Sequence, residues 1–449
     1  MEMTNLDATP GRTLSTPARP ARGVPEALQQ QIKTAVHKEL IKRLDLDRLN
    51  DFNQTRAGQQ QLFSMIQRLM GEQGIPLSSA ERDKLTQEVV DEVFGLGPIE
   101  PLLNDPTIGD ILVNTFDSVY IERHGVLERT NIAFKDNRHL MHIIDKIVSA
   151  VGRRVDESSP MVDARLKDGS RVNVIIPPLA IDGPILSIRR FGSMPLTSED
   201  LLRSQMLTPP MLDVLKSAVE ARVNIVISGG TGAGKTTLLN VLSGFISSKE
   251  RIVTIEDSAE LQMKQHHVVR LETRPPNMEG HGAVRQRELM INALRMRPDR
   301  IVLGEVRGEE TLDMLQAMNT GHDGSLTTVH ANSPRDALAR METMTMMGDI
   351  KLPEKAIHAQ IASAIQLIVQ VARLGDGSRR ITHISELTGA YSETISMNEI
   401  FLFERKGLTE SGKSKGRFYS TGILPRFYDK LTAAGLPLPV GLSGHSVEV

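Results

Sequence analysis

The feature that most constrains this chain is a glycine-rich run, Gly229–Thr236, which lies between an apolar stretch and a helix-favouring stretch. It matches the Walker A pattern G-x-x-x-x-G-K-[ST], with a predicted strand over Asn224–Ser228 before it and a predicted helix over Thr237–Phe245 after it. Glycines in such a loop let backbone N–H groups turn inward round a phosphate, and the helix N-terminus adds partial positive charge. The run therefore predicts a P-loop α/β domain that binds a nucleotide.

The loop also assigns roles to single residues. Lys235 is expected to bridge the β- and γ-phosphate oxygens of ATP, and Thr236 is expected to offer its hydroxyl to Mg²⁺. The predicted nucleotide-binding residues are Gly229, Gly230, Thr231, Gly232, Ala233, Gly234, Lys235, Thr236 and Thr237. ATP and Mg²⁺ are therefore the expected ligands.

Acidic residues follow two apolar strands further along the chain. Glu305 comes after the strand Arg300–Leu303, and Glu256 and Asp257 come after the strand Arg251–Ile255. Ligands of open α/β sheets bind at the carboxyl ends of the strands, so these groups are expected beside the phosphate loop. Hydrolysis needs a group that orients water and a partner for the metal. We expect Glu256 and Glu305 to supply both, and their position leaves open which does which.

A glycine and two histidines complete the predicted site. Gly304 stands where a metal-linked Asp is usually found, so metal support is expected from Thr236, Glu305 and waters. His330 ends a third core strand and is expected to reach the γ-phosphate and report its presence. His322, which precedes that strand, is the second candidate for this role.

The rest of the chain predicts a modular protein, because 449 residues exceed one ordinary core. In the last segment strands alternate with helices, which is typical of a parallel sheet with helices on both faces. The expected fold class is α/β, a RecA-like P-loop ATPase domain preceded by an α+β domain and an N-terminal helical bundle. The predicted segments are a disordered tail (1–25), a helical bundle (26–94) whose last helix starts at a Ser78-x-x-Glu81 capping box, an α+β domain (95–192), a linker (193–207) and the ATPase domain with a C-terminal extension (208–449).

Composition limits the partners and the cellular compartment that we expect for this chain. The formal net charge is −2, with 53 Lys and Arg against 55 Asp and Glu, and aromatic residues make up 3 %, so nucleic acid is not an expected partner. There is no Cys and no apolar run of the roughly 18 residues that a membrane span needs. A soluble protein of a reducing cytoplasm is expected.

Several motifs together carry a family resemblance. The set GGTGAGKTT, IVTIEDSAEL, LRMRPDRIVLGEVRG and TGHDGSLTTVHAN, with PLLNDPTIGDILVN upstream, resembles the secretion and type IV pilus ATPase superfamily. Within it, LETRPPNMEG, AMNTGHDG and GRFYSTGILPRFYDKL resemble the Tad or Flp pilus ATPases, the CpaF/TadA-like group. The likeness spans roughly residues 90 to 435.

This resemblance implies further roles. Glu256 and Asp257 match the family's Asp box, Glu305 its Walker B position, and His322 and His330 its His box, and Gly304 is normal for the family. Arginines that close on the nucleotide are implied at Arg171, Arg189 and Arg190. The resemblance also implies a homo-hexamer at the cytoplasmic face of the inner membrane, which associates with the membrane through partners and drives a pilus platform protein in assembly, with retraction left open.

Three alternatives remain at this point. The first is an ATPase of type II or type IV secretion, although the tetracysteine module common in type II secretion ATPases is impossible without Cys, and the AIRNLIRE motif of dedicated retraction motors is not present. The second is a nucleic-acid translocase on a RecA-like core, which predicts stimulation by single-stranded DNA. The third is a scaffold that binds nucleotide without turnover.

Overall fold

The structure is a computed structural model. It describes residues 56–72, 77–123, 126–191, 195–276, 280–348, 352–391, 394–410, 412–439 and 444–449, with positions 28, 31–33, 35, 36, 39, 40, 74 and 442. The predicted tail, 1–25, lies outside these residues. The chain divides into two compact units. The first comprises Met1–Ile121, Glu128–Leu166 and Val172–Ile188, and the second Glu122–Leu127, Lys167–Arg171 and Arg189–Val449.

The first unit begins with helices. Helices α3 (Arg56–Glu72) and α4 (Ser79–Val93) present apolar side chains at helical spacing, and these side chains are buried together with Ile32, Val36 and Leu40. The predicted capping box is present, because the Ser78 side chain accepts from the backbone N–H of Glu81 while the Glu81 side chain accepts from that of Ser78.

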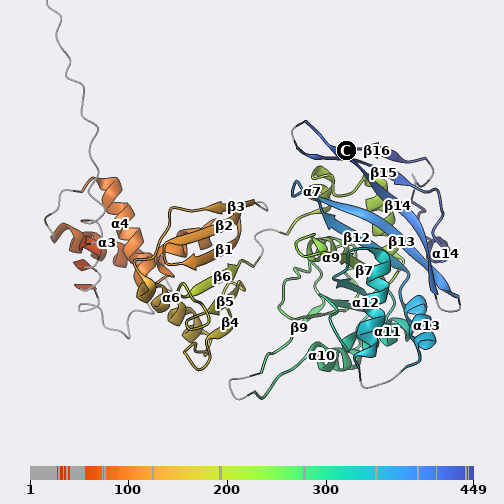
Figure 1. The fold of residues 1–449 in the computed structure, drawn as a ribbon, viewed down its shortest axis with the longest axis horizontal. Coiled ribbons are helices and arrows are strands. Elements are labelled where there is room, and N and C mark those ends of the chain that lie inside the picture. Colours follow the sequence, from red (N-terminus) through yellow and green to blue (C-terminus); the bar gives the residue numbers. More distant parts are fainter. Residues whose placement is uncertain are drawn as a thin grey trace, which may run out of the picture. The chain divides into compact units, whose positions relative to one another are not determined.

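A six-stranded sheet and helix α6 form most of the rest of the first unit (Figure 1). The strand order is β3-β2-β1-β6-β5-β4, and the amphipathic helix α6 (Asn137–Ala150) packs its apolar face on the strands. The expected α+β arrangement is present, and the two strands that the sequence pattern did not reveal are β3 and β4. The bounds are η1 Gly97–Ile99, α5 Glu100–Asn104, β1 Ile108–Thr115, β2 Ser118–Arg123, β3 Val126–Arg129, β4 Met161–Arg165, β5 Arg171–Ile175 and β6 Ile185–Arg189.

The second unit is built on a ten-stranded sheet in the order β16-β15-β14-β13-β12-β7-β11-β10-β8-β9. Strands β12, β7, β11, β10, β8 and β9 are parallel, as the alternation of strands and helices predicts. The bounds are β7 Ile225–Gly229, β8 Ile252–Glu256, β9 Val268–Glu272, β10 Arg300–Leu303, β11 Leu326–Val329, β12 Leu367–Arg373, β13 Arg379–Tyr391, β14 Thr394–Leu408, β15 Ser414–Ser420 and β16 Ser446–Glu448.

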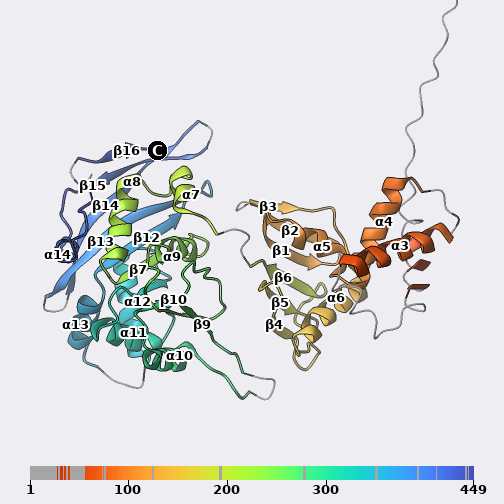
Figure 2. The same ribbon diagram turned by 180° about the vertical axis from the view of Figure 1, so that it is seen from behind.

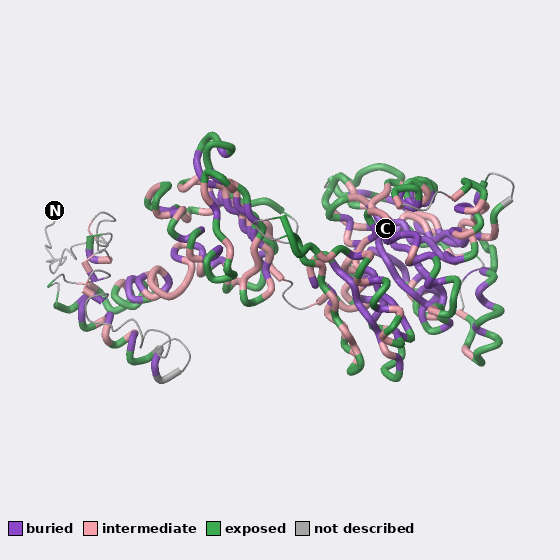
Figure 3. The backbone as a smooth tube through the Cα atoms, turned by 90° about the horizontal axis from the view of Figure 1, so that it is seen from below, coloured by how far each residue is buried: buried purple, intermediate pink, exposed green. Residues whose placement is uncertain are grey.

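Helices cover both faces of this sheet (Figure 1; Figure 2). Successive strand residues point to opposite faces, so Ile225 and Ile227 pack in one core with α8 and α9, while Val226 packs in the other with α10 to α13. Buried positions run through the interior of each unit (Figure 3). The bounds are α7 Ser198–Arg203, α8 Pro209–Glu220, α9 Lys235–Ser243, α10 Gln286–Ala293, η2 Leu294–Met296, α11 Glu310–Asn319, α12 Pro334–Met346, α13 Glu354–Ala364 and α14 Tyr428–Ala433.

The C-terminal part differs from a purely parallel sheet. Strands β13 to β16 continue the sheet as an antiparallel meander from β12, so the predicted C-terminal extension is mostly strand. Antiparallel pairs need only short connections, so among the described residues no helix lies between β12 and β15, and α14 lies between β15 and β16. Among the described residues, no helix is long and apolar enough to cross a membrane.

Candidate active site

The phosphate loop follows the fully buried strand β7, which pairs with β11 on one side and β12 on the other. Gly232 and Gly234 have φ angles of 69° and 98°, which only glycine adopts without strain. A Cβ on Gly229 would lie 2.5 Å from the carbonyl oxygen of Val371. Helix α9 begins at Lys235, two residues before the predicted start, so the free N–H groups of its first turn belong to the loop.

Lys235 lies inside this loop and is 7 % exposed. Its Nζ donates to the carbonyl oxygen of Gly230 at 3.1 Å and lies 3.2 Å from Nε2 of His330. Burial lowers the pKa of Lys235, while the carboxylate of Glu305 opposes that shift. The ammonium therefore sits where the loop's backbone and a strand-end histidine converge.

Glu305 and His330 come together from neighbouring strands. His330 directly follows β11, Glu305 follows β10, and Nε2 of His330 lies 3.1 Å from Oε1 of Glu305. Burial lowers the pKa of His330, and the Lys235 ammonium lowers it further, so the neutral imidazole is favoured. Lys235, His330 and Glu305 thus form one chain of polar contacts from the phosphate loop to a carboxylate.

Arg307 fixes the second oxygen of that carboxylate. Its guanidinium lies 2.8 Å from Oε2 of Glu305 and 3.1 Å from Oδ2 of Asp257. The arginine therefore joins the acidic residues that follow β10 and β8.

Glu256 is the most buried acidic group here, at 3 % exposure. Its Oε2 accepts from the backbone N–H groups of Glu260 and Leu261 at 2.7 and 2.9 Å, and its Oε1 has no hydrogen-bond partner among the described residues. Burial raises the pKa of Glu256 against the opposing effect of these two bonds. A Cβ on Gly304 would lie 3.1 Å from Cγ of Glu256, so the glycine leaves room for this side chain.

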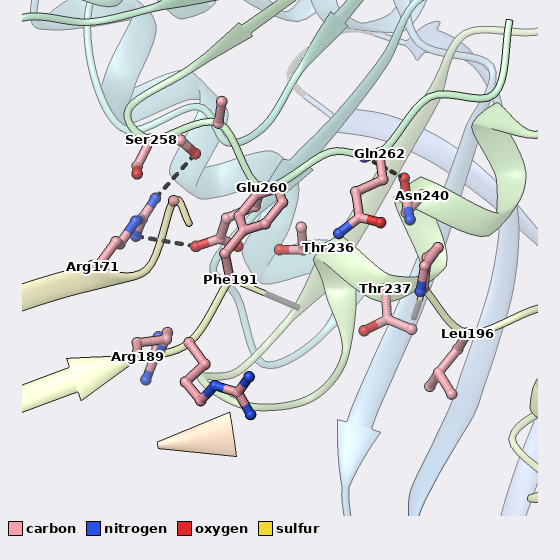
Figure 4. A pocket seen from close by; sticks show the side chains of 14 residues that line it. Arg171, Arg189, Phe191, Leu196, Thr236, Thr237, Asn240, Ser258, Glu260 and Gln262 are labelled. Atoms are coloured by element: carbon pink, nitrogen blue, oxygen red, sulfur yellow. Dashed lines mark hydrogen bonds and ion pairs between the residues drawn. The ribbon is translucent and has the colours of Figure 1, made fainter. Parts of the chain in front are cut away.

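The predicted arginines line a cavity of about 280 Å³ within the second unit (Figure 4). Arg171 contacts Glu260 at 3.1 Å and donates to the carbonyl oxygen of Ser258 at 3.1 Å. Arg189 and Arg190 line the same cavity as Thr236 and Thr237 of the phosphate loop. The remaining lining residues are Gly169, Phe191, Pro195, Leu196, Asn240, Ser258, Ala259, Glu260 and Gln262.

His322 lies elsewhere. It precedes β11, its N–H donates to the carbonyl oxygen of Ala317, and its own carbonyl oxygen accepts from Ser325 Oγ. Seven residues separate it from His330, and the four of them that form β11 alone span about 13 Å. The structure therefore places His322 at the amino end of the strand, whereas the phosphate loop lies at the carboxyl end.

Comparison with known proteins decides the family. Residues 92–421 match the family described as Type II/IV secretion system protein. The chain belongs to this family. Together with the phosphate loop and its carboxylates, the membership makes the chain an ATPase of the type II/IV secretion class.

Proteins similar to this secretion ATPase have names that refer to conjugal transfer or type IV secretion. It is 41 % identical over 305 residues to a putative conjugal transfer protein of Mycobacterium tuberculosis, covering 67 % of this chain and 86 % of the relative. It is 35 % identical over 314 residues to the type IV secretion system protein PtlH of Bordetella pertussis (64 % and 92 %). Among solved structures, the VirB11 ATPase of Brucella suis is 28 % identical with a TM-score of 0.36 (66 % and 97 %), and the pilus retraction motor PilT is 19 % identical with a TM-score of 0.46 (66 % and 82 %).

The ATPase has a second cavity beside the loop, of about 620 Å³. Gly230 and Thr231 of the phosphate loop line it, together with His330 and Arg307. Helix α12 supplies Arg340, whose charge helps to lower the pKa of both Lys235 and His330. The remaining lining residues are Ala331, Asn332, Asp336, Ala339, Thr343, Met344 and Met347.

The oxygen donors of the ATPase suit Mg²⁺. Hydroxyl and carboxylate oxygens are the ligands that Mg²⁺ takes in nucleotide sites, where it keeps several waters and phosphate oxygens as well. Thr236 and Glu305 provide such oxygens, and Oε1 of Glu256 is a further oxygen, without a hydrogen-bond partner in the part of the chain that the structure describes. These residues therefore fit the ion that the sequence predicts.

One contact of the phosphate loop was not foreseen from the sequence. Arg379, the first residue of β13, donates from Nε to the carbonyl oxygen of Gly232 at 3.0 Å. The two residues are 147 positions apart, and Arg379 follows an exposed turn without any motif. Only the pairing of β12 with β7 brings them together.

Proposed function

We propose that this ATPase is the motor of a type IV secretion-type machine, and that it acts as a homo-hexamer at the cytoplasmic face of the inner membrane on a membrane-embedded component. The observation that carries the motor assignment is the contact chain from Lys235 through His330 to Glu305, in which Nδ1 of His330 lies 3.4 Å from Nζ of Lys235 and Nε2 lies 3.1 Å from Oε1 of Glu305. Such a chain links the state of the γ-phosphate to the strands that bear it. The conjugal transfer and type IV secretion relatives support the choice of machine.

In the proposed cycle, ATP replaces the internal partners of the loop. Lys235 exchanges the carbonyl oxygen of Gly230 for β- and γ-phosphate oxygens, and the backbone N–H groups of Gly232 to Thr237 bind the phosphates. His330 then contacts the γ-phosphate while it remains bound to Glu305. Bound Mg²⁺, held through Thr236 and Glu305, would neutralise charge that develops on the phosphates.

Glu256 is proposed as the residue that polarises the attacking water. Burial raises the pKa of its carboxyl, which makes the carboxylate a better proton acceptor, and one of its oxygens has no partner among the described residues. Glu305 is bound to both Arg307 and His330, which suits a residue that orders the metal shell and transmits the phosphate state. We propose this division for the two roles that position in the sequence leaves open.

The arginines of the first cavity are proposed to stabilise the transition state. Charge develops on the γ-phosphate during transfer, and cations placed there lower the barrier by several kcal/mol. Arg171 is already held at the cavity by Glu260, and Arg189 and Arg190 line it with Thr236. Their replacement by Gln is expected to lower kcat more than nucleotide affinity.

Two matched variants test the assignment of the carboxylates. Glu256→Gln is expected to bind a fluorescent ATP analogue normally and to lose phosphate release by roughly 10²-fold or more. Glu305→Gln is expected to keep nucleotide binding, lose turnover and require a higher Mg²⁺ concentration for its residual rate. Full turnover in Glu305→Gln, or an unchanged Mg²⁺ dependence, would overturn the division of roles.

The partner and the oligomeric state are tested together. Glu305→Gln loaded with ATP is purified from membranes, and its mass and associated membrane proteins are measured, with Lys235→Ala as the control that does not bind nucleotide. The proposal expects a hexamer with an integral membrane protein in the trapped variant only. A monomer without a membrane partner in both variants contradicts the proposal, and stimulation of phosphate release by single-stranded DNA points to the translocase instead.

A Tad or Flp pilus motor is the second candidate, in which the membrane component is the pilus platform protein. The sequence stretches LETRPPNMEG, AMNTGHDG and GRFYSTGILPRFYDKL favour it. The last of these stretches forms β15 and the connection to α14, where the buried carboxylate of Glu386 accepts from the backbone N–H groups of Arg426 and Phe427 at 3.0 and 3.2 Å. Loss of surface pili after gene deletion, with secretion and conjugal transfer intact, supports the pilus motor, and the reverse result supports the secretion motor.

A further inference from the structure

The turn between β12 and β13 contacts the phosphate loop at Gly232 and Gly234. Arg379 Nε donates to the carbonyl oxygen of Gly232 at 3.0 Å, and a Cβ on Gly234 would lie 3.2 Å from Cδ of Arg379. Arg373, at the end of β12, places a guanidinium nitrogen 3.5 Å from the position of a Cβ on Gly232. Because β12 and β11 flank β7 on opposite sides, this contact lies across the loop from His330.

The turn is well supported by its own hydrogen bonds. Asp376 Oδ1 accepts from the backbone N–H and the hydroxyl of Ser378 at 3.0 and 2.7 Å, and its Oδ2 accepts from the backbone N–H of Ser414 at 2.6 Å. These bonds hold the pKa of the Asp376 carboxyl well below its usual range. The turn therefore presents Arg379 from a fixed position.

The neighbouring residues hold the start of β13 as well. Arg380 is buried and donates to the carbonyl oxygen of Ser204 at 3.1 Å, and the backbone N–H of Ile381 donates to the carbonyl oxygen of Met206 at 2.8 Å. A side chain on such a support keeps its geometry when a ligand binds beside it.

We infer that Arg379 is a positioning residue for nucleotide binding, which acts through the peptide unit between Gly232 and Ala233. In a trans peptide the C=O and the following N–H point in opposite directions. By holding the carbonyl oxygen of Gly232 outward, Arg379 keeps the N–H of Ala233 directed into the loop, where it now donates to the carbonyl oxygen of Gly230 at 3.3 Å and where we infer that it turns to the phosphate when ATP binds. The inference rests on the ATPase activity and not on which machine the motor drives.

This role has a kinetic signature. An interaction that prepares the loop for phosphate acts equally on the bound substrate and on the transition state, so its loss raises KM and leaves kcat nearly unchanged. Gly232 is exposed, so water can replace the lost donor, and the net loss of one hydrogen bond corresponds to an about three- to tenfold loss of affinity. A residue that only stabilises the fold would not give this separation.

Three substitutions in the full-length protein distinguish the possible causes. Arg379→Met keeps an unbranched side chain out to the position of the arginine Nε and removes the donor. Arg379→Gln places an amide N–H donor at the same distance along the side chain as the arginine Nε, without the charge. Arg379→Lys keeps the charge and changes the donor position. Arg417→Met is the matched control, because Arg417 on β15 binds Glu404 and not the loop.

The measurements are the affinity for a fluorescent ATP analogue, KM and kcat of phosphate release, and the melting temperature without nucleotide. We expect Arg379→Met to bind the analogue about three- to tenfold more weakly and to raise KM by the same factor, with kcat within about twofold of the wild type. Arg379→Gln is expected to stay close to the wild type. The control is expected to behave as the wild type. The inference is overturned if Arg379→Met binds normally, if Arg379→Lys alone restores affinity, or if Arg379→Met melts well below the control.

If Arg379→Met does not fold, Asp376→Ala provides the second test. It loosens the turn without touching the loop, and it is expected to raise KM by a smaller factor than the loss of Arg379, with kcat again nearly unchanged. An unchanged KM in a folded Asp376→Ala protein, or a fall in kcat alone, overturns the inference.

Discussion

Replacing Gly304 by Ala tests whether the position of Glu256 controls turnover. The added Cβ would lie 3.1 Å from Cγ, 3.6 Å from Cβ and 3.7 Å from Cα of Glu256. Carbon atoms in favourable contact are about 3.5 to 4.0 Å apart, so the Glu256 side chain must move by about 0.4 Å. The added methyl group therefore displaces the side chain of Glu256, which is the residue that we propose as the one that polarises the attacking water.

The expected effect on activity exceeds the effect on stability. The Oε2 atom of Glu256 is held by N–H groups at 2.7 and 2.9 Å, and a shift of a few tenths of an ångström keeps both hydrogen bonds within range. Overpacking of this size costs about 1 to 2 kcal/mol of folding free energy. A misplacement of about 1 Å in a catalytic group costs on the order of 10²-fold in rate, so we expect kcat to fall roughly tenfold.

The assay is steady-state phosphate release, with nucleotide affinity and urea unfolding measured in parallel. Gly348→Ala is the control, because a Cβ there would meet only ordinary contacts, the nearest at 3.8 Å. The decisive comparison repeats Gly304→Ala in the Glu256→Gln background, where displacement of a residue that has already lost its function should cost nothing further. Full activity in Gly304→Ala, or an equal fall in both backgrounds, would refute the reasoning.

Two further predictions concern stability. Arg300 is fully buried and bound to Glu250 at 2.8 Å, so Arg300→Met should lower the free energy of unfolding in urea by about 3 to 5 kcal/mol, with part of the loss recovered when Glu250→Gln is added. Burial raises the pKa of Glu386, so the native state binds a proton more readily than the unfolded chain, and the contribution of this residue to stability falls as pH rises from about 4.3 through its raised pKa. Glu386→Gln should therefore flatten the fall in melting temperature over that window, and an unchanged slope in the variant would contradict the sign.

The core of the second unit could be predicted from the sequence because its signals are local. An apolar strand, a glycine loop and a helix start lie within about twenty residues. The local motif alone therefore identifies Lys235 as a phosphate-binding residue. The carboxylates follow the same logic, since parallel strands bring their carboxyl ends to one edge. The strand bounds of β7, β8 and β10 agree with the predicted stretches to within one residue.

The rest could not be predicted because it depends on pairings that are distant in sequence. Arg379 becomes part of the loop only through the pairing of β12 with β7, and no local pattern marks it. The placement of His322 is different, because the sequence already contained the relevant signal. A four-residue strand separates it from His330, so the two side chains had to lie at opposite ends of β11.

The two sides of the phosphate loop carry different groups, so substitutions on each side should change different kinetic constants. On the side of β11, β10 and β8 lie His330, Glu305 and Glu256, which can act on the γ-phosphate and on water. On the side of β12 lies a hydrogen-bonded turn that presents Arg379 to the backbone of the loop. Changes on the first side should therefore alter kcat, and changes on the second should alter KM. Affinity for ATP and speed of turnover would then be adjustable separately, because different strands carry them.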